Sequence, residues 1–79
     1  MMDAINVETI GNRAYKEIKK RAEENGTSPS REAEKFGMLN NKLLSMWKKN
    51  GNPVAYYLQQ MYYAGYDVIY ILTGERSTK

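Results

Sequence analysis

Cysteine and histidine are both absent from this 79-residue sequence. Without cysteine the chain can form no disulfide, and it offers no thiolate nucleophile or thiolate metal ligand. Without histidine it has no imidazole metal ligand and cannot build a triad of serine, histidine and acid. The carboxylates mostly lie beside Lys or Arg at helical spacing, which is typical of solvated surface charge. We therefore expect no enzyme, no cofactor and no metal site.

Long apolar runs are missing as well. No segment approaches the roughly 20 apolar residues that cross a bilayer. The first residues, MMDAINVE, lack the basic start and the apolar core of a signal peptide. We therefore expect a cytoplasmic protein with no membrane partner. The length predicts one small domain over residues 1–79, which buries only about 60% of its unfolded surface, so a second subunit would help to stabilise it.

Positive charge is in modest excess, since twelve Lys and Arg against nine Asp and Glu give a net charge of +3. This balance is compatible with a polyanionic partner, although many proteins without such a partner share it. The cations gather in two segments. The first comprises Arg13, Lys16, Lys19, Lys20 and Arg21, and the second comprises Lys42, Lys48 and Lys49. For the first segment, a solvated helix flank and contact with phosphates are both open interpretations.

The first half of the chain predicts two helices. Over residues 7–25, five apolar residues recur at spacings of three and four, which places them on one face of a helix. Asn6 is the expected N-cap of this helix, and Gly26 is the expected left-handed residue at its end. A Ser–Pro pair then begins a short second helix, which stops at Gly37. Its expected core-facing residues are Ala33 and Phe36.

A third helix is predicted at residues 40–49, with Asn40 as its N-cap. One side of it is apolar and carries Leu39, Leu43, Leu44 and Trp47. The opposite side is polar or cationic and carries Asn41, Lys42, Ser45, Lys48 and Lys49, with Met46 at the border. An ordinary surface helix mixes both signs of charge, whereas this face contains no acid. That pattern is the strongest physical indication of a nucleic-acid partner in the sequence.

Two further helices are predicted in the second half, which makes the expected fold all-α. Asn52 is the expected cap of the fourth helix, and Pro53 is its expected first residue. The segment 68–72, VIYIL, has the composition of a strand. However, Asp67 and Gly74 are suited to cap a short helix, and no second strand is available for pairing. A helix that is apolar on all sides must be covered, and a second copy of the chain is the natural cover.

The stretch 28–47 therefore has the layout of a helix-turn-helix unit, which places its second helix in the DNA major groove. With these elements placed, the chain resembles the lambda-repressor-like (XRE) family, in its phage-repressor or Cro-like branch. Residues 28–37 are similar to the first motif helix of that family, and Leu44 and Trp47 match buried positions of its recognition helix. WKKNGNP, at 47–53, is similar to the exit from that helix. AGYDVIYILTGERS, at 64–77, carries the most specific part of the resemblance, which extends over nearly the whole chain.

The resemblance implies a compact five-helix bundle with motif helices at about 29–36 and 40–49. It implies a bacterial, nucleoid-associated repressor that binds a palindromic operator as a homodimer. Base contacts fall by position on Asn41, Lys42 and Met46, with Ser45 between them, and Asn40 is also counted among the DNA-binding residues. Lys48 and Lys49 are expected to hold phosphates or to be merely solvated. A dimer interface is expected in the segment 62–74, at Tyr66, Val68, Ile69, Ile71 and Leu72.

Three departures from the family pattern accompany this resemblance. Glu32 stands where the family usually has an apolar residue, and Lys48 stands where it usually has Glu. One extra residue follows Gly37, so the start of the recognition helix can shift by one position. Met46 is accordingly either a core residue or a contact to a thymine methyl group.

Two alternatives remain open on function and extent. The same fold can instead serve as a protein-binding module, as in an antirepressor, an antitoxin or an inhibitor. Many phage repressors also carry a self-cleaving domain with a catalytic Ser and Lys, which this sequence does not contain. The chain is therefore interpreted either as a short Cro-like regulator or as an excised DNA-binding domain.

Overall fold

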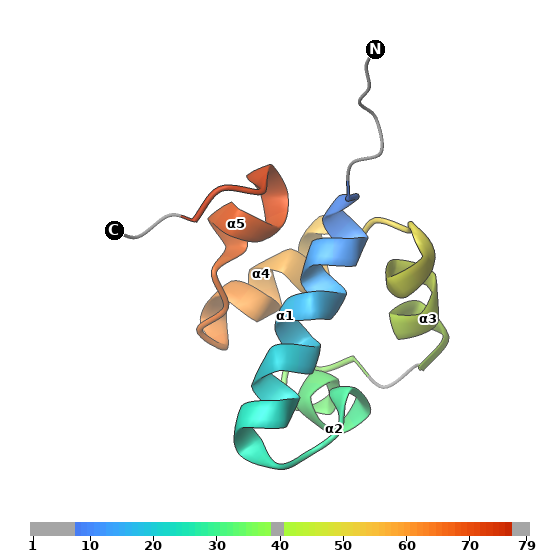
Figure 1. Ribbon diagram of the computed structural model, residues 1–79, viewed down its shortest axis with the longest axis vertical. Coiled ribbons are helices and arrows are strands. Elements are labelled where there is room, and N and C mark those ends of the chain that lie inside the picture. Colours follow the sequence, from blue (N-terminus) through green and yellow to red (C-terminus); the bar gives the residue numbers. More distant parts are fainter. Residues whose placement is uncertain (1–7, 39–40, 77–79) are drawn as a thin grey trace.

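Five helices form the part of the chain that the computed structural model describes, residues 8–38 and 41–76 (Figure 1). They are α1 (Ile10–Asn25), α2 (Pro29–Glu34), α3 (Asn41–Lys49), α4 (Ala55–Tyr63) and α5 (Val68–Thr73). These two ranges contain no strand, so the predicted all-α fold class is confirmed for them. None of their helices has the length and apolar character needed to cross a bilayer.

Helix α1 is the central element, and it contacts α2, α3 and α5 (Figure 1). Its buried face includes Ala14, Ile18 and Ala22, which follow one another at four-residue spacing. Two of these residues are alanines, and their small side chains allow neighbouring helices to approach the α1 backbone. The part of the predicted apolar stripe that the structure describes is thus confirmed.

The start of α1 differs from the sequence prediction. The predicted cap, Asn6, lies outside the described residues, and the helix begins at Ile10. Thr9 is the N-cap, because its side chain accepts a hydrogen bond from the Asn12 backbone while the Asn12 side chain accepts one from the Thr9 backbone. This reciprocal pair satisfies two N–H groups that would otherwise have no partner, so it fixes the helix start there. The end of the helix is as predicted, with Gly26 in the left-handed conformation.

Local signals placed α5 and the start of α2 correctly, whereas α2 ends at Glu34, before the predicted end near residue 36. Ser28 caps α2 and Pro29 is its first residue, as predicted. The segment 68–73 is a helix, in which the Asp67 side chain accepts a hydrogen bond from the Tyr70 backbone. Gly74 ends this helix in the left-handed conformation. The caps therefore outweighed the strand composition of α5.

The prediction for the start of α4 is wrong. Asn52 does not cap this helix and Pro53 is not its first residue, because α4 begins at Ala55 and Val54 is its N-cap. Val54 has an extended backbone, with ψ at 160°, and its side chain makes no capping hydrogen bond. The Gly51 carbonyl, just before this segment, accepts a hydrogen bond from the Thr9 hydroxyl at 3.4 Å. The connection therefore contacts α1 at Gly51 and reaches the start of α4 through an extended Val54.

The core lies between α1 and the other four helices. Its largest fully buried side chains are apolar with one exception, and they are Trp47, Ile18, Met38, Met61, Ile71 and Glu32. Aromatic rings meet edge to face within it, with centroids 5.7 Å apart for Phe36 and Tyr66 and 6.0 Å apart for Trp47 and Tyr57. The predicted core positions Ala33 and Phe36 are both buried.

Candidate nucleic-acid interface

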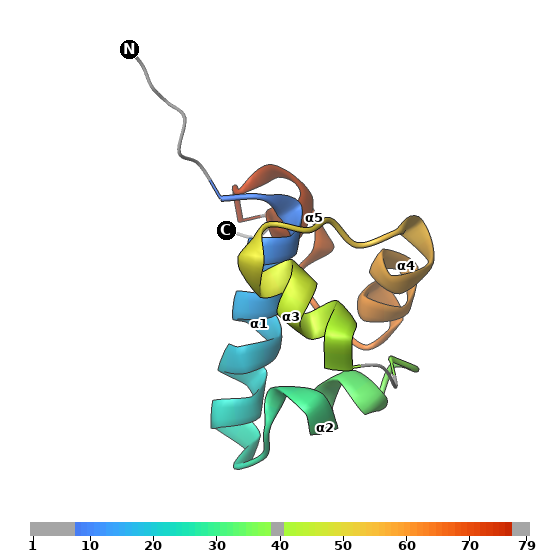
Figure 2. The same cartoon turned by 90° about the vertical axis from the view of Figure 1, so that its right-hand side faces the viewer.

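Helix α3 lies in front of α1 in Figure 2, and it has one buried and one solvent-facing side. Leu44 and Trp47 are buried and hold the helix on α1 and α2. The opposite side is exposed, and we call it the outer face; it consists of Asn41, Lys42, Ser45, Met46, Lys48 and Lys49. Met46 is 56% exposed, so it belongs to the surface and not to the core. Asn40, the predicted cap, lies outside the described residues.

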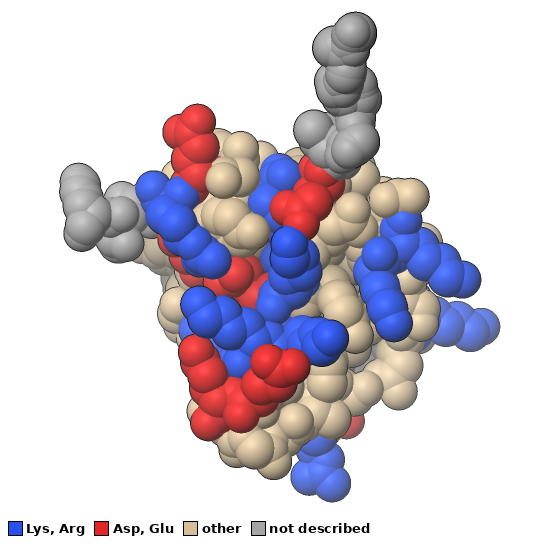
Figure 3. Space-filling model, viewed as in Figure 1, with Lys and Arg blue, Asp and Glu red and all other residues tan. Residues whose placement is uncertain are grey.

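The charge on this side of the molecule is positive. In Figure 3, Lys and Arg side chains stand over α3 on the right without acidic neighbours there, whereas both signs are mixed over α1 and α5. The Lys48 ammonium lies 5.8 Å from the centre of the Tyr15 ring, so an aromatic face adjoins the cations. A surface of one sign attracts a polyanion and raises its rate of encounter.

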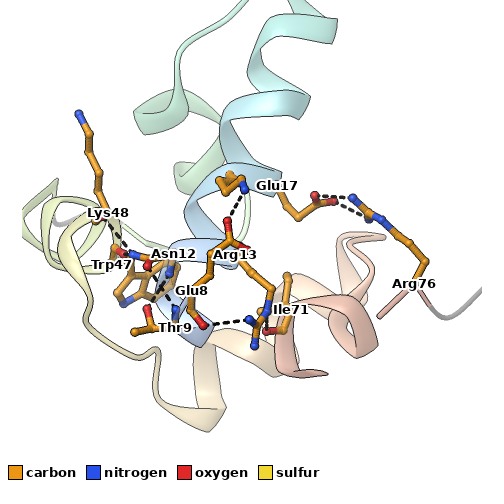
Figure 4. Close-up of polar contacts among 10 residues, drawn as sticks. Glu8, Thr9, Asn12, Arg13, Glu17, Trp47, Lys48, Ile71 and Arg76 are labelled. Carbon is orange, nitrogen blue, oxygen red and sulfur yellow. Dashed lines mark hydrogen bonds and ion pairs between the residues drawn. The ribbon is translucent and has the colours of Figure 1, made fainter. Parts of the chain in front are cut away.

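The last turn of α3 is held by the first turn of α1 (Figure 4). The Asn12 side-chain amide donates to the Trp47 carbonyl at 2.9 Å and to the Lys48 carbonyl at 3.1 Å. Nearby, α1 approaches the backbone at Gly51 through Gly11, which has no Cβ to obstruct the contact. These contacts fix the orientation in which the outer face is presented. Asn12 was not singled out in the sequence, where its capping position was the only available signal.

A shallow hollow of about 300 Å³ lies beside the outer face. Tyr15, Pro29 and Ser30 line it from α1 and α2, and Asn41, Ser45 and Lys48 line it from α3. Hydroxyl, amide and ammonium groups are the donors that proteins use to hold phosphate oxygens. Sequence reasoning missed Tyr15 and Ser30. In the sequence, Tyr15 lies next to the apolar stripe of α1 but is not part of it, and this position was the available signal.

Two arginines in the basic segment of α1 are hydrogen-bonded within the subunit. Arg13 donates to the Ile71 carbonyl at 2.9 Å and to the Leu72 carbonyl at 3.2 Å, at the end of α5. Arg21 donates to the Ala64 carbonyl at 2.7 Å, and its guanidinium lies 3.7 Å from the centre of the Tyr66 ring. These two arginines therefore join helices, and phosphate contact is not needed to explain them.

Two other charged side chains of α1 form ion pairs. Lys16 pairs with Glu8, and this contact raises the pKa of the Lys16 ammonium. Arg76 pairs with both carboxylate oxygens of Glu17, at 3.2 and 3.0 Å. That hydrogen bonding, which is drawn in Figure 4, raises the pKa of the Arg76 guanidinium. Lys16 and Glu17 of α1 therefore each have a partner of opposite charge within the subunit.

The expected dimer segment divides into buried and exposed side chains. Tyr66 and Ile71 pack in the interior of the subunit and are not available to a partner, which corrects their assignment to a contact surface. Ile69 is 52% exposed and Leu72 is 41% exposed, while Val68 is half-buried. A helix of two turns cannot turn every apolar side chain inward, and α1 and α4 cover only part of it.

An apolar groove of about 420 Å³ adjoins these exposed residues between α4 and α5. Its lining is mostly aromatic or aliphatic and includes Leu58, Tyr62, Tyr63, Val68 and Ile69. Tyr62 is 66% exposed and Tyr63 is 70% exposed. Neither α4 nor α5 contains a charged residue, and Asp67, just before α5, is the one charged residue in the lining. Aromatic enrichment together with depletion of charge is typical of the centre of a protein–protein interface.

Glu32, the acid at a position where an apolar residue was expected, is buried in α2. Its carboxylate accepts hydrogen bonds from the Thr27 hydroxyl, the Lys35 ammonium and the Asn25 amide. The bond from Thr27 contributes most to lowering the pKa of this carboxyl, against the opposite effect of burial. A polar cluster therefore links the end of α1 to α2.

No acidic cluster capable of holding a metal ion occurs among residues 8–38 and 41–76. Comparisons with protein families, with curated proteins and with solved structures find no match to the chain.

Proposed function

We propose that this chain is a sequence-specific DNA-binding regulator of the lambda-repressor-like type. In this proposal α2 and α3 form the helix-turn-helix unit, and α3 enters the major groove. The protein acts in the bacterial cytoplasm by occluding a promoter and performs no chemical step. The observation that carries the proposal is the outer face of α3, which is exposed, cationic and free of acid, and which is held rigidly from behind by Leu44 and Trp47.

Each exposed side chain of the outer face has a chemical role in the proposal. Asn41 pairs with adenine through N6 and N7, and Lys42 donates to guanine O6 or N7. Ser45 donates to or accepts from a base edge, and Met46 contacts a thymine methyl group. Lys48 and Lys49 hold phosphates and set the register without reading the sequence. Tyr15 and Ser30 extend the phosphate contacts beside them.

The regulator acts as a homodimer on a palindromic operator. The exposed side chains of α5, Ile69 and Leu72, meet their copies across a two-fold axis, and Tyr62 and Tyr63 enlarge the contact. A two-fold dimer presents two copies of α3 to successive major grooves, about 34 Å apart. The uncharged surface of α4 and α5 supports a self-complementary contact, because two like-charged surfaces would repel each other.

Selection of bound sequences from a random duplex pool tests this proposal. We expect an enriched site with two-fold symmetry and half-sites one helical turn apart. Binding to random duplex should fall steeply, by roughly a hundredfold or more, between about 50 and 200 mM salt. A pool without enrichment, combined with no binding at low salt, would refute the proposal.

A second candidate function is a protein-binding module, such as an antirepressor, an antitoxin or an inhibitor. The exposed tyrosines of α4 and the adjoining groove favour it, because aromatic side chains are enriched in protein interfaces. The same salt titration separates the two candidates, since a protein-binding module has no salt-sensitive affinity for duplex DNA.

A further inference from the structure

The first turn of α1 contacts two helices that lie on opposite sides of it. Asn12 holds the last turn of α3 through the carbonyls of Trp47 and Lys48. Arg13, the next residue, holds the last turn of α5 through the carbonyls of Ile71 and Leu72. Figure 4 shows both sets of contacts leaving the same turn in different directions.

Both contacts are directed at the ends of helices, where the last carbonyls have no partner within the helix. The Arg13 guanidinium also brings positive charge to the negative end of the α5 dipole, which strengthens that contact. Two nitrogens of its planar guanidinium donate to the Ile71 and Leu72 carbonyls, and the third donates to the Glu8 carbonyl at 3.0 Å. Each helix end is thereby fixed in position, and not merely covered.

The turn itself is braced. The reciprocal hydrogen bonds between Thr9 and Asn12 fix its backbone, and the Asn12 side chain uses its oxygen for that bond and its nitrogen for α3. Gly11, the residue before Asn12, lies against the Gly51 backbone. A movement of α3 relative to α5 must therefore break hydrogen bonds on one side of this turn or the other.

We infer that the first turn of α1 sets the position of α3 relative to α5, with Asn12 and Arg13 as positioning residues. The functional consequence rests on the proposed DNA-binding dimer. If α5 forms the dimer contact and α3 enters the groove, the distance between the two copies of α3 depends on this turn. Asn12 and Arg13 then determine which half-site spacing the dimer accepts, although neither residue lies on the outer face.

The first experiment requires no DNA. Because the sequence has no cysteine, spin labels can be attached to two introduced cysteines, Ser45→Cys on α3 and Thr73→Cys on α5. Pulsed electron resonance then measures the distribution of distances between the labels, with the labelled chains diluted in unlabelled protein. Asn12→Asp keeps the oxygen that accepts from Thr9 but loses the donor to α3. Arg13→Lys keeps the positive charge but loses the planar guanidinium that donates to several carbonyls. It is the second test variant, and it can be used if Asn12→Asp does not fold.

We expect Asn12→Asp and Arg13→Lys to broaden or shift the distance distribution. The control is Lys20→Gln, an exposed change on α1 that alters the net charge as Asn12→Asp does. It should leave the distribution as in the parent. An unchanged distribution in both folded variants would overturn the inference, whatever the protein does with DNA.

The second experiment measures spacing on the selected operator. One inserted base pair moves a half-site by about 3.4 Å and rotates it by roughly 35°. The parent protein should bind the altered site about tenfold more weakly, a loss comparable to that from a mismatched base pair. For Asn12→Asp, the ratio of the affinities for the selected and the altered site should approach one. For Lys20→Gln, this ratio should equal that of the parent. A variant that discriminates spacing as sharply as the parent would overturn the inference, whereas failure of the parent to bind any duplex would refute the proposed function.

Discussion

Gly11 and Gly51 meet backbone to backbone where α1 passes the end of α3. A Cβ on Gly11 would lie 1.7 Å from the Gly51 carbonyl oxygen, far inside any van der Waals contact. Since the obstructing atom belongs to the backbone, it cannot move aside as a flexible side chain does. The contact therefore requires glycine at position 11, although this residue lies within a helix, where glycine is otherwise unfavourable.

Gly11→Ala should consequently destabilise the protein. Alanine has the better helix propensity by about 1 kcal/mol. However, the clash is with backbone atoms and forces α1 and α3 apart, so its cost lies at the upper end of the about 1–3 kcal/mol that overpacking costs. We expect a net loss of stability in urea unfolding followed by circular dichroism. The control is Glu24→Ala on the exposed side of α1, which should change stability by less than about 0.5 kcal/mol. Equal stability of Gly11→Ala and the parent would contradict the close approach.

Asn41→Ala and Lys42→Ala should each weaken binding to the selected operator by about 1–3 kcal/mol and relax specificity at one base position. Lys48→Ala is the matched comparison, because a phosphate contact is lost equally on every sequence and the salt dependence becomes shallower. Fluorescence anisotropy with cognate and random duplexes measures both quantities. Equal losses on the two duplexes for Asn41→Ala and Lys42→Ala would show that these residues do not read bases.

Ile69→Asp should convert a dimer to a folded monomer. Because Ile69 is exposed in the subunit, the introduced carboxylate would be buried only when two subunits associate. Ile71→Asp, two residues along the same helix, should instead prevent folding, because Ile71 is fully buried in the subunit. Sedimentation velocity measures association, and circular dichroism measures folding. An Ile69→Asp protein that sediments as a dimer would place the interface elsewhere.

The Glu32 cluster predicts a pH dependence of stability. The pKa of this carboxyl is lower in the folded chain than its ordinary value of 4.5, so the ionised form is the one that folding favours. Its contribution is fully present above pH 4.5 and is lost as the pH falls through the lowered pKa of the folded state. Glu32→Gln should therefore be less stable than the parent at neutral pH, and the difference should shrink in acid.

Urea unfolding at several pH values, with both proteins in the same buffers, measures this difference. The control is Glu34→Gln, an exposed change on the same helix, which should show little difference at any pH. A gap between Glu32→Gln and the parent that stays constant from neutral to acid pH would show that the carboxylate charge does not contribute.

The sequence by itself determined the features that depend on residues three or four positions apart. The caps at Gly26, Ser28, Asp67 and Gly74 satisfy the ends of their own helices, so local spacing was enough to recognise them. The outer face of α3 was likewise predicted from the sequence, because an amphipathic helix has one apolar side to bury. The helical character of 68–73 followed from its caps.

Only the tertiary structure decided which residues far apart in the sequence contact each other. Helix α5 is apolar on all sides, so its own sequence could not show that Ile71 faces inward and Ile69 outward; the positions of α1 and α4 decided that. The start of α4 at Ala55 followed from the contact of Gly51 with α1 and the extended Val54. Arg13 had the same sequence signal as any surface cation, and its role depends on carbonyls 58 and 59 residues away. Local spacing carries no information on partners at such separations, because packing of the completed helices brings them together.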